Sequence, residues 1–155
     1  MALAEGFRFG PHIVSHSQSF LQSRLSYAFV NLKPIVPGHM LVAPLRVVHR
    51  FTDLNPDEIA DLFQTTQRVS RAIEIAYKSI ALTIAIQDGV GAGQTVEHVH
   101  VHIIPRHKDD FVPNDKIYHE LDQHDKEAQR RARTSQEMAD EATWFRQFLA
   151  MDTAN

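Results

Sequence analysis

The sequence has no cysteine among its 155 residues. A disulfide framework and a zinc site built on thiolates are therefore excluded. The first ten residues, MALAEGFRFG, also lack the basic and apolar stretches of a secretory signal peptide. Together these absences favour a reducing, intracellular setting, and we expect a cytoplasmic protein, with the nucleus as a second location.

Long apolar runs and an excess of positive charge are missing as well. No stretch approaches the roughly 18 apolar residues of a transmembrane helix. The formal net charge is −3 with histidine neutral, so no general positive field attracts a nucleic-acid backbone. We therefore expect neither membrane nor nucleic acid as a partner, whereas a small anionic ligand in a local pocket stays compatible with the sequence.

The composition is that of one globular domain, which we expect to span residues 1–155. Hydrophobic residues make up 43% of the chain and charged residues 23%, as is ordinary for such domains. Short apolar runs bounded by turn residues predict strands at 7–10, 26–32, 39–45 and 82–88, followed by a strand that carries three histidines. The tight turn KPIVPG between two of these strands favours antiparallel pairing.

Two helices complete the predicted fold. The first has Asn55 as its N-cap and Pro56 at its first helical position. Its expected buried stripe comprises Ile59, Leu62, Phe63, Val69, Ile73 and Ala76. The second opens with a capping box from Thr134 to Glu137 and presents Met138, Ala142, Phe145 and Leu149 on its apolar side. The predicted class is α+β, with a mostly antiparallel sheet of about five strands and helices on one face.

Residues 107–133 form a polar and charged segment with few aliphatic side chains. Such a composition provides little apolar surface to bury. We therefore predict a mobile loop at 107–133.

The stretch EHVHVHIIPR places His98, His100 and His102 two residues apart. On a strand, residues two apart share one face and lie about 6.6 Å from each other. The valines and isoleucines between them then face the core. The histidine face is expected to be solvated or to lie in a pocket, because buried imidazoles need hydrogen-bond partners.

Three interpretations of this face compete. It can be a solvated polar face that happens to be histidine. It can hold zinc through two histidines and a third ligand from elsewhere, although the outer pair lie about 13 Å apart on an extended strand. It can also serve nucleophilic catalysis, since neutral imidazole has a lone pair that attacks phosphorus. We favour the third interpretation.

The preceding loop, QDGVGAGQTV, holds three of the six glycines, Gly89, Gly91 and Gly93. Glycine-rich loops bring backbone N–H groups close to phosphate oxygens. Gln87 and Gln94 add uncharged donors at this position. By itself the loop is a weak signal, but it leads directly into the histidine strand.

The string HVHVHIIPR resembles the histidine-triad motif, His-φ-His-φ-His-φ-φ with φ apolar, in every histidine and every apolar position. The Pro-Arg that follows the motif is similar to the fragile histidine triad (Fhit) branch, whose members are dinucleoside triphosphate hydrolases. The likeness extends through FVNLKPIVPGHMLVAP and NDKIYHELDQHDKE, whereas the arginine cluster at 130–133 departs from it.

This resemblance implies hydrolysis of diadenosine triphosphate to AMP and a nucleoside diphosphate through a covalent AMP–histidine intermediate. It implies a homodimer with one continuous sheet, no organic cofactor, and a divalent cation, Mg²⁺ or Mn²⁺, that accompanies the substrate phosphates. A preference for diadenosine tetraphosphate stays open. So does a role as a nucleotide-binding signalling module whose output is the substrate-bound form.

The resemblance also implies residue roles. His100 is the expected nucleophile, and His98 is expected to orient the site through a hydrogen bond with His39. His102 and Gln94 are expected to contact phosphate oxygens. The further expected substrate-binding residues are His12, Asn31, Gln87, Gly93, Thr95, Val96 and Tyr118. None of these residues is expected to hold a resident metal.

Overall fold

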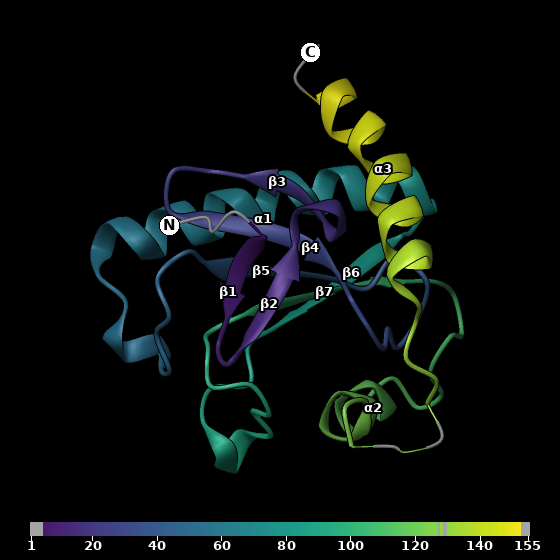
Figure 1. The fold of residues 1–155 in the computed structure, drawn as a ribbon. Helices are drawn as coiled ribbons and strands as arrows, with labels where there is room; N and C mark the ends of the chain where they lie inside the picture. Colours follow the sequence, from purple (N-terminus) through teal and green to yellow (C-terminus); the bar gives the residue numbers. More distant parts are fainter. Residues whose placement is uncertain (1–4, 127, 129, 153–155) are drawn as a thin grey trace.

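The computed structural model describes residues 5–126, 128 and 130–152 (Figure 1). The strands are β1 (Gly6–Phe9), β2 (His12–Ser15), β3 (Ser19–Gln22), β4 (Ser26–Val30), β5 (Met40–Pro44), β6 (Ala81–Ala85) and β7 (Val101–Arg106). The α-helices are α1 (Pro56–Tyr77), α2 (Lys116–Gln123) and α3 (Ser135–Asp152). Within these described ranges, no helix is both long enough and apolar enough to cross a bilayer.

Five strands form one antiparallel sheet in the order β3-β4-β5-β7-β6, and β1 pairs with β2 in a separate hairpin. The α+β class and a five-stranded antiparallel sheet are therefore confirmed. The predicted strand at 7–10, however, belongs to the hairpin, and β3, which was not predicted, takes its place in the sheet. The register places Leu41 opposite His102, and His102 opposite Ala85. The third histidine thus lies in the middle of the sheet.

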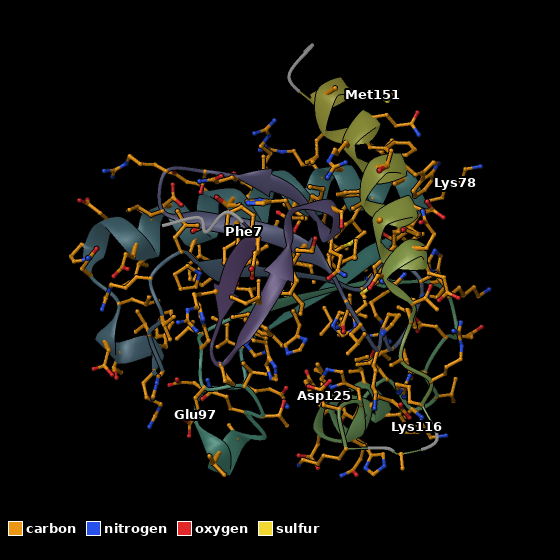
Figure 2. The ribbon with its side chains drawn as sticks, viewed as in Figure 1. Phe7, Lys78, Glu97, Lys116, Asp125 and Met151 are labelled. Carbon is orange, nitrogen blue, oxygen red and sulfur yellow. The ribbon has the colours of Figure 1, made fainter. Side chains whose placement is uncertain are left out.

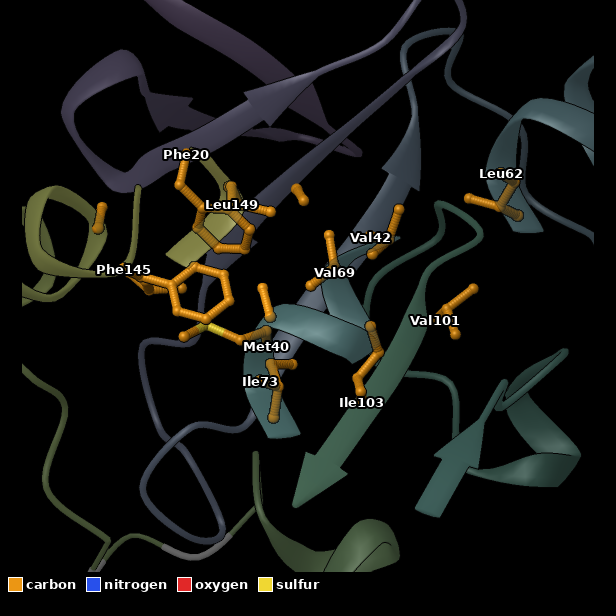
Figure 3. Close-up of a cluster of buried hydrophobic side chains, with 14 of the residues drawn as sticks. Phe20, Met40, Val42, Leu62, Val69, Ile73, Val101, Ile103, Phe145 and Leu149 are labelled. Atoms are coloured by element: carbon orange, nitrogen blue, oxygen red, sulfur yellow. The ribbon is translucent and has the colours of Figure 1, made fainter. Parts of the chain in front are cut away.

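The two faces of the sheet bury different partners. Met40, Val42 and Val101 belong to the main core, which α1 and α3 cover (Figure 3). Alternate residues such as Leu41 and Phe29 point to the opposite face, where the β1-β2 hairpin packs. The two predicted helices, α1 and α3, lie on one face as expected. The other face carries the hairpin, helix α2 packed on Ile104, and the side chain of His102.

Phe63 is an exception to the predicted helix stripe. Its side chain is 41% exposed and meets the edge of the Phe51 ring instead of entering the core. Leu62, one residue earlier, is fully buried. The prediction for Phe63 is wrong because the buried stripe of α1 follows Leu62, Val69 and Ile73 and is narrower than the sequence pattern suggested.

The prediction of a mobile loop at 107–133 is wrong for Lys116–Gln123, which forms helix α2. Ile117 and Leu121 of α2 are buried against Ile104 of β7. These few apolar contacts hold α2 against the sheet, although the segment as a whole is rich in charged residues. The mobility of the remaining segment stays a prediction.

Both predicted helix starts are confirmed. Thr134 and Glu137 exchange side-chain-to-backbone hydrogen bonds at the start of α3. At the start of α1, Asn55 accepts from the N–H of Glu58, whose carboxylate accepts from the N–H of Asn55. Buried Glu58 also forms an ion pair with Arg46. The capping box of Asn55 and Glu58 therefore fixes the start of α1. The ion pair of Glu58 with Arg46 also ties the segment before α1 to the helix.

Asn55→Ala is expected to lower the free energy of unfolding by about 1 kcal/mol, because the N–H of Glu58 loses its acceptor. Urea denaturation measures this loss. Glu74→Gln, an exposed change in the same helix, is the matched control and should stay within about 0.5 kcal/mol of the wild type. Equal stabilities for the two variants would contradict the role assigned to the cap.

Candidate active site

The histidine run lies at the entry to β7 and not wholly within it. β7 begins at Val101, so His98 and His100 belong to a segment that bends at His98 and has no ladder partner on the sheet. The N–H of Val99 donates to the carbonyl of Val48 at 2.7 Å and anchors this segment. The expectation of three histidines on one regular strand is therefore wrong for the first two.

All three imidazoles are buried, and two of them line a cavity of about 560 Å³. The interpretation of a solvated face is thus wrong, and the pocket interpretation is confirmed for His100 and His102. The cavity is lined by Phe9, His12, Ile13, Val14, Gln18, Phe29, Val30, Asn31, Leu32, Lys33, Leu41, Thr95, Val96, His100, His102, His124, Asp125 and Met138. The hairpin, the turn after β4, the glycine loop and the segment after α2 all contribute to it.

His98 lies behind the cavity wall and has both ring nitrogens hydrogen-bonded. The N–H of Gly10 donates to Nδ1 at 2.9 Å, so Nε2 carries the proton and donates to the carbonyl of Pro44 at 2.8 Å. The expected hydrogen bond between His98 and His39 is therefore wrong. His98 instead ties the turn of the hairpin to the end of β5.

His100 has its tautomer fixed by the main chain. Its Nδ1 lies 2.8 Å from the carbonyl oxygen of His98, which only accepts. Nδ1 must carry the proton, and Nε2 keeps its lone pair. The edge of the Phe9 ring packs against the imidazole at 5.0 Å between centroids and limits its rotation. An imidazole held in this way is a nucleophile at Nε2.

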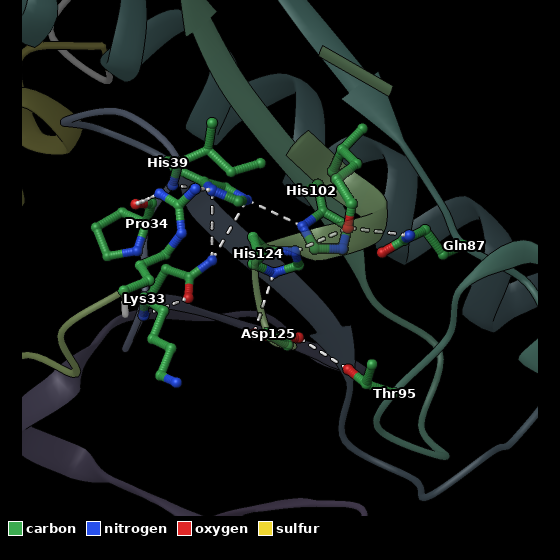
Figure 4. Close-up of polar contacts among 12 residues, drawn as sticks. Lys33, Pro34, His39, Gln87, Thr95, His102, His124 and Asp125 are labelled. Carbon is green, nitrogen blue, oxygen red and sulfur yellow. Dashed lines mark hydrogen bonds and ion pairs between the residues drawn. The ribbon is translucent and has the colours of Figure 1, made fainter. Parts of the chain in front are cut away.

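His39 and His102 form a relay that starts from another backbone N–H (Figure 4). The N–H of Ile35 donates to His39 Nδ1 at 3.0 Å, so the proton of His39 resides on Nε2. That proton is donated to His102 Nδ1 at 2.9 Å. His102 therefore carries its own proton on Nε2, a buried atom without a hydrogen-bond partner among the described residues. This N–H is a preorganised donor for an anionic group in the cavity.

Burial keeps these imidazoles neutral. Desolvation lowers the pKa of His98 to about 4, and it lowers the pKa values of His39 and His102 well below their usual range. Desolvation also lowers the pKa of His100, although the negative charge of Asp125 acts in the opposite direction. At pH 7 the nucleophile therefore has its lone pair without first losing a proton.

Of the other predicted substrate-binding residues, His12, Asn31, Thr95 and Val96 line the cavity. The amide oxygen of buried Asn31 accepts from the N–H of Lys33, which fixes the orientation of the side chain. Its amide nitrogen lies 3.3 Å from His39 Nε2. Because His39 Nε2 donates its proton to His102, both of these nitrogens are donors, and Asn31 packs beside His39 without a hydrogen bond to it.

The glutamines of the glycine loop do not reach the cavity. Gln94 accepts from the N–H of Gly89 and donates to the carbonyl of His49. Gln87 donates to the carbonyl of Leu121 on α2. Both side chains hold the loop in its conformation, and the structure places neither beside His102. Tyr118 does not line the cavity either; it lies on α2 and is 60% exposed.

The loop's backbone donors are also used internally. The N–H groups of Ala92, Gly93 and Gln94 donate to carbonyls of residues 89 and 90. Gly93 has a φ of +93°, and a Cβ there would lie 2.6 Å from Gln87 Nε2. The glycine is therefore required by packing and backbone conformation. The expected use of these loop N–H groups as phosphate donors is not what the structure shows.

His124 and Asp125 line the cavity but were not predicted from the sequence. Thr95 Oγ1 donates to Asp125 Oδ2 at 2.8 Å, and His124 Nε2 lies 3.2 Å from Asp125 Oδ1 (Figure 4). The available signal was the string HDKE, which follows an amphipathic pattern that includes Ile117 and Leu121. The prediction of a loop at 107–133 did not take this helical pattern into account.

The hydrogen bonds of the triad leave too few free ring nitrogens for the zinc site considered from the sequence. Both nitrogens of His98 are occupied, and His102 Nδ1 accepts the proton of His39. Among the described residues, no group of three or more histidine, aspartate or glutamate side chains is arranged to hold a metal ion.

A five-stranded antiparallel sheet with buried, main-chain-oriented histidines at the start of an interior strand, β7, defines the histidine-triad class. A family model described as "HIT domain" matches residues 13–109. The bifunctional bis(5'-adenosyl)-triphosphatase/adenylylsulfatase FHIT of Arabidopsis thaliana is 47% identical over 148 residues, covering 90% of this chain and 82% of that protein. The bis(5'-nucleosyl)-tetraphosphatase (asymmetrical) of Schizosaccharomyces pombe is 43% identical, covering 86% of this chain and 90% of that protein.

A solved structure shows the same fold. The Plasmodium falciparum diadenosine triphosphate hydrolase, determined in complex with Cyclomarin A, superimposes with a TM-score of 0.79 at 30% identity, covering 96% of this chain and 87% of that chain. The chain belongs to the HIT domain family.

The depressed pKa of His98 makes the stability of the fold depend on pH. The unfolded chain takes up a proton near pH 6.5, whereas the folded chain does so only near pH 4. The stabilisation is therefore complete above pH 6.5 and is lost as the pH falls towards 4, with a size of about 3 kcal/mol. Urea unfolding at pH 7, 5.5 and 4 should show this fall. His98→Gln should start less stable and fall less steeply, and parallel curves would contradict the assignment.

Proposed function

We propose that this chain hydrolyses dinucleoside triphosphates, diadenosine triphosphate in particular, by nucleotidyl transfer to His100 and then to water. The observation that carries the proposal is the fixed tautomer of His100, which leaves the Nε2 lone pair available in the same cavity as the Nε2–H of His102. The names of the Arabidopsis and Plasmodium relatives support the same reaction.

The reaction has two displacements. In the first, His100 Nε2 forms a bond to the α-phosphorus, and the bond from that phosphorus to its bridging oxygen breaks, which releases ADP. The Nε2–H of His102 donates to a non-bridging oxygen as charge develops there. In the second, water forms a bond to phosphorus and the P–Nε2 bond breaks, which releases AMP. His98 holds the imidazole of His100 through its carbonyl during both steps.

The cavity wall supports a nucleoside beside this phosphate site. Phe9, Ile13 and Phe29 supply apolar surface, on which a base can stack. His12 and Asn31 supply polar atoms at the rim and the wall, and we assign Asn31 to the ribose. Gln94, Gln87 and Tyr118 lie outside the cavity, so any contact they make with substrate requires a movement of their segments.

The substrate is proposed to be the Mg²⁺ or Mn²⁺ complex of the dinucleotide. Lys33 is the one lysine or arginine side chain among the described residues that line the cavity. A cation bound to the polyphosphate offsets the charge that neutral imidazoles leave uncompensated. No organic cofactor enters the proposed reaction.

A preference for dinucleoside tetraphosphates is the second candidate, because the Schizosaccharomyces pombe relative carries that name. Both candidates share the nucleophile and the cavity, and they differ only in the length of the leaving group. Rates measured with three-, four- and five-phosphate dinucleotides decide between them.

His100→Asn is expected to lower the turnover of diadenosine triphosphate by about 10⁴-fold or more, because the attacking lone pair is removed. Binding of the dinucleotide, measured by calorimetry, should change by less than about 10-fold, since most of the pocket is kept. His119→Asn, an exposed change on α2, is the matched control. Substantial hydrolysis by the His100 variant would overturn the proposed function.

We also propose a homodimer formed through the free edge of β6. The sheet ends at β6, and Ile80 and Ile84 are exposed along this edge. An exposed apolar edge strand pairs readily with another strand. Two copies related by a twofold axis would join their sheets into one.

Ile84→Lys is expected to convert the dimer to a monomer, because a lysine at this edge opposes strand pairing. Light scattering after gel filtration should then report the 17.7 kDa of one chain in place of twice that mass. Met151→Lys, an exposed change at the far end of α3, should leave the mass of the wild type unchanged. A monomeric wild type would contradict the proposed dimer.

A further inference from the structure

The segment after α2 brings a carboxylate into the cavity. Asp125 lines the same cavity as His100 and is the one acidic side chain among the described lining residues. A hydrogen bond joins Thr95 to Asp125. Glu97 and Asp125 both lie at the end of the molecule opposite Met151 (Figure 2). The side chain of Asp125 is 34% exposed, so the carboxylate is accessible to water.

Asp125 is held by a hydrogen bond from Thr95 and, when His124 is an imidazolium, by an ion pair with that ring. Thr95 Oγ1 donates to Oδ2 at 2.8 Å, and His124 Nε2 lies 3.2 Å from Oδ1. His124 is itself fixed, because its Nδ1 donates to the carbonyl of Leu121 at 2.9 Å and its ring packs edge-on against His102 at 5.3 Å between centroids. A carboxylate accepts about four hydrogen bonds, so each oxygen keeps capacity for another donor.

The proposed reaction needs a proton acceptor that the triad does not supply. When His100 carries the nucleotidyl group, its Nε2 is bonded to phosphorus and its Nδ1 donates to a carbonyl. His98 and His39 each have one nitrogen that accepts and one that donates. His102 accepts at Nδ1 and carries a proton at Nε2. None of these four imidazoles has a free lone pair for the proton of the attacking water.

We propose that Asp125 is the catalytic residue that accepts this proton, an inference that rests on the proposed function. The water O–H bond breaks and its proton passes to a carboxylate oxygen of Asp125, while the water oxygen forms a bond to the α-phosphorus. The P–Nε2 bond breaks and its electron pair returns to His100. AMP then leaves, and Asp125 gives up the proton to solvent. Thr95 and the imidazolium form of His124 are positioning residues for the carboxylate.

The charge of Asp125 separates this role from a role in substrate binding. A carboxylate in the cavity repels the polyphosphate of the substrate. Removing the charge in Asp125→Asn should therefore leave binding of the intact dinucleotide unchanged or tighter. A residue needed only for binding or for folding would show the opposite effect.

The test is a quenched-flow experiment on the full chain with diadenosine triphosphate labelled at the α-phosphorus. In the wild type, label should appear on the protein and disappear within each turnover. In Asp125→Asn, labelling should proceed at a similar rate, whereas release of AMP should slow by about 100-fold. Labelled protein then accumulates, and KM falls together with kcat. Asp122→Asn removes an acid of α2 whose side chain is 48% exposed and lies outside the cavity, and both rates should match the wild type.

Each remaining outcome decides the inference. Equal slowing of both steps in Asp125→Asn, or no slowing of either, would overturn it while the label on the wild type still supports the proposed function. If the wild type neither takes up label nor releases AMP, the proposed function itself fails. If Asp125→Asn does not fold, Thr95→Val carries the same test, because it removes one of the two groups that hold the carboxylate. Selective slowing of AMP release by Thr95→Val supports the inference, and any other result opposes it.

Discussion

The site depends on the hydrogen bond from His100 Nδ1 to the carbonyl of His98. A carbonyl oxygen only accepts, so this single contact decides which nitrogen of His100 bears the proton and which bears the lone pair. The backbone N–H of Ile35 makes the equivalent decision for His39 and, through it, for His102. Main-chain groups, whose roles cannot change, thus determine the roles of three ambivalent side chains.

This arrangement explains why the imidazoles are buried. Burial removes competing water, lowers their pKa values and keeps the assigned tautomers in place. The cost of burial is offset because each nitrogen except the reactive ones has a partner. One partner comes from each of three parts of the fold: the carbonyl of Pro44 on β5, the N–H of Gly10 in the hairpin turn, and the N–H of Ile35 in the turn before β5. The orientation of the imidazoles therefore depends on contacts from across the fold.

The sequence predicted the scaffold well because its signals are local. Alternating apolar residues predicted the central strands, and Asn55 with Pro56 predicted the start of α1, as the structure confirms. The triad was evident from its spacing and from its resemblance to a family. The partner of His98 was predicted incorrectly, because Gly10 and Pro44 are 88 and 54 residues away and carry no side-chain signal. Contacts made by distant main-chain atoms leave no trace in a residue pattern.

In the segment 107–133 the local composition was misleading, whereas for His98 the sequence carried no signal. The segment's charged composition is real, but the few apolar residues of α2 suffice to dock it on β7 next to the cavity. Docking places His124 and Asp125 in the wall, where a fixed acceptor complements a triad whose other lone pairs are already used. A nucleophile whose tautomer is fixed attacks well but cannot also serve as the base for the water that follows. A hydrolase of this kind therefore needs a second group, and in this chain the described cavity provides one carboxylate in a position to fulfil that need.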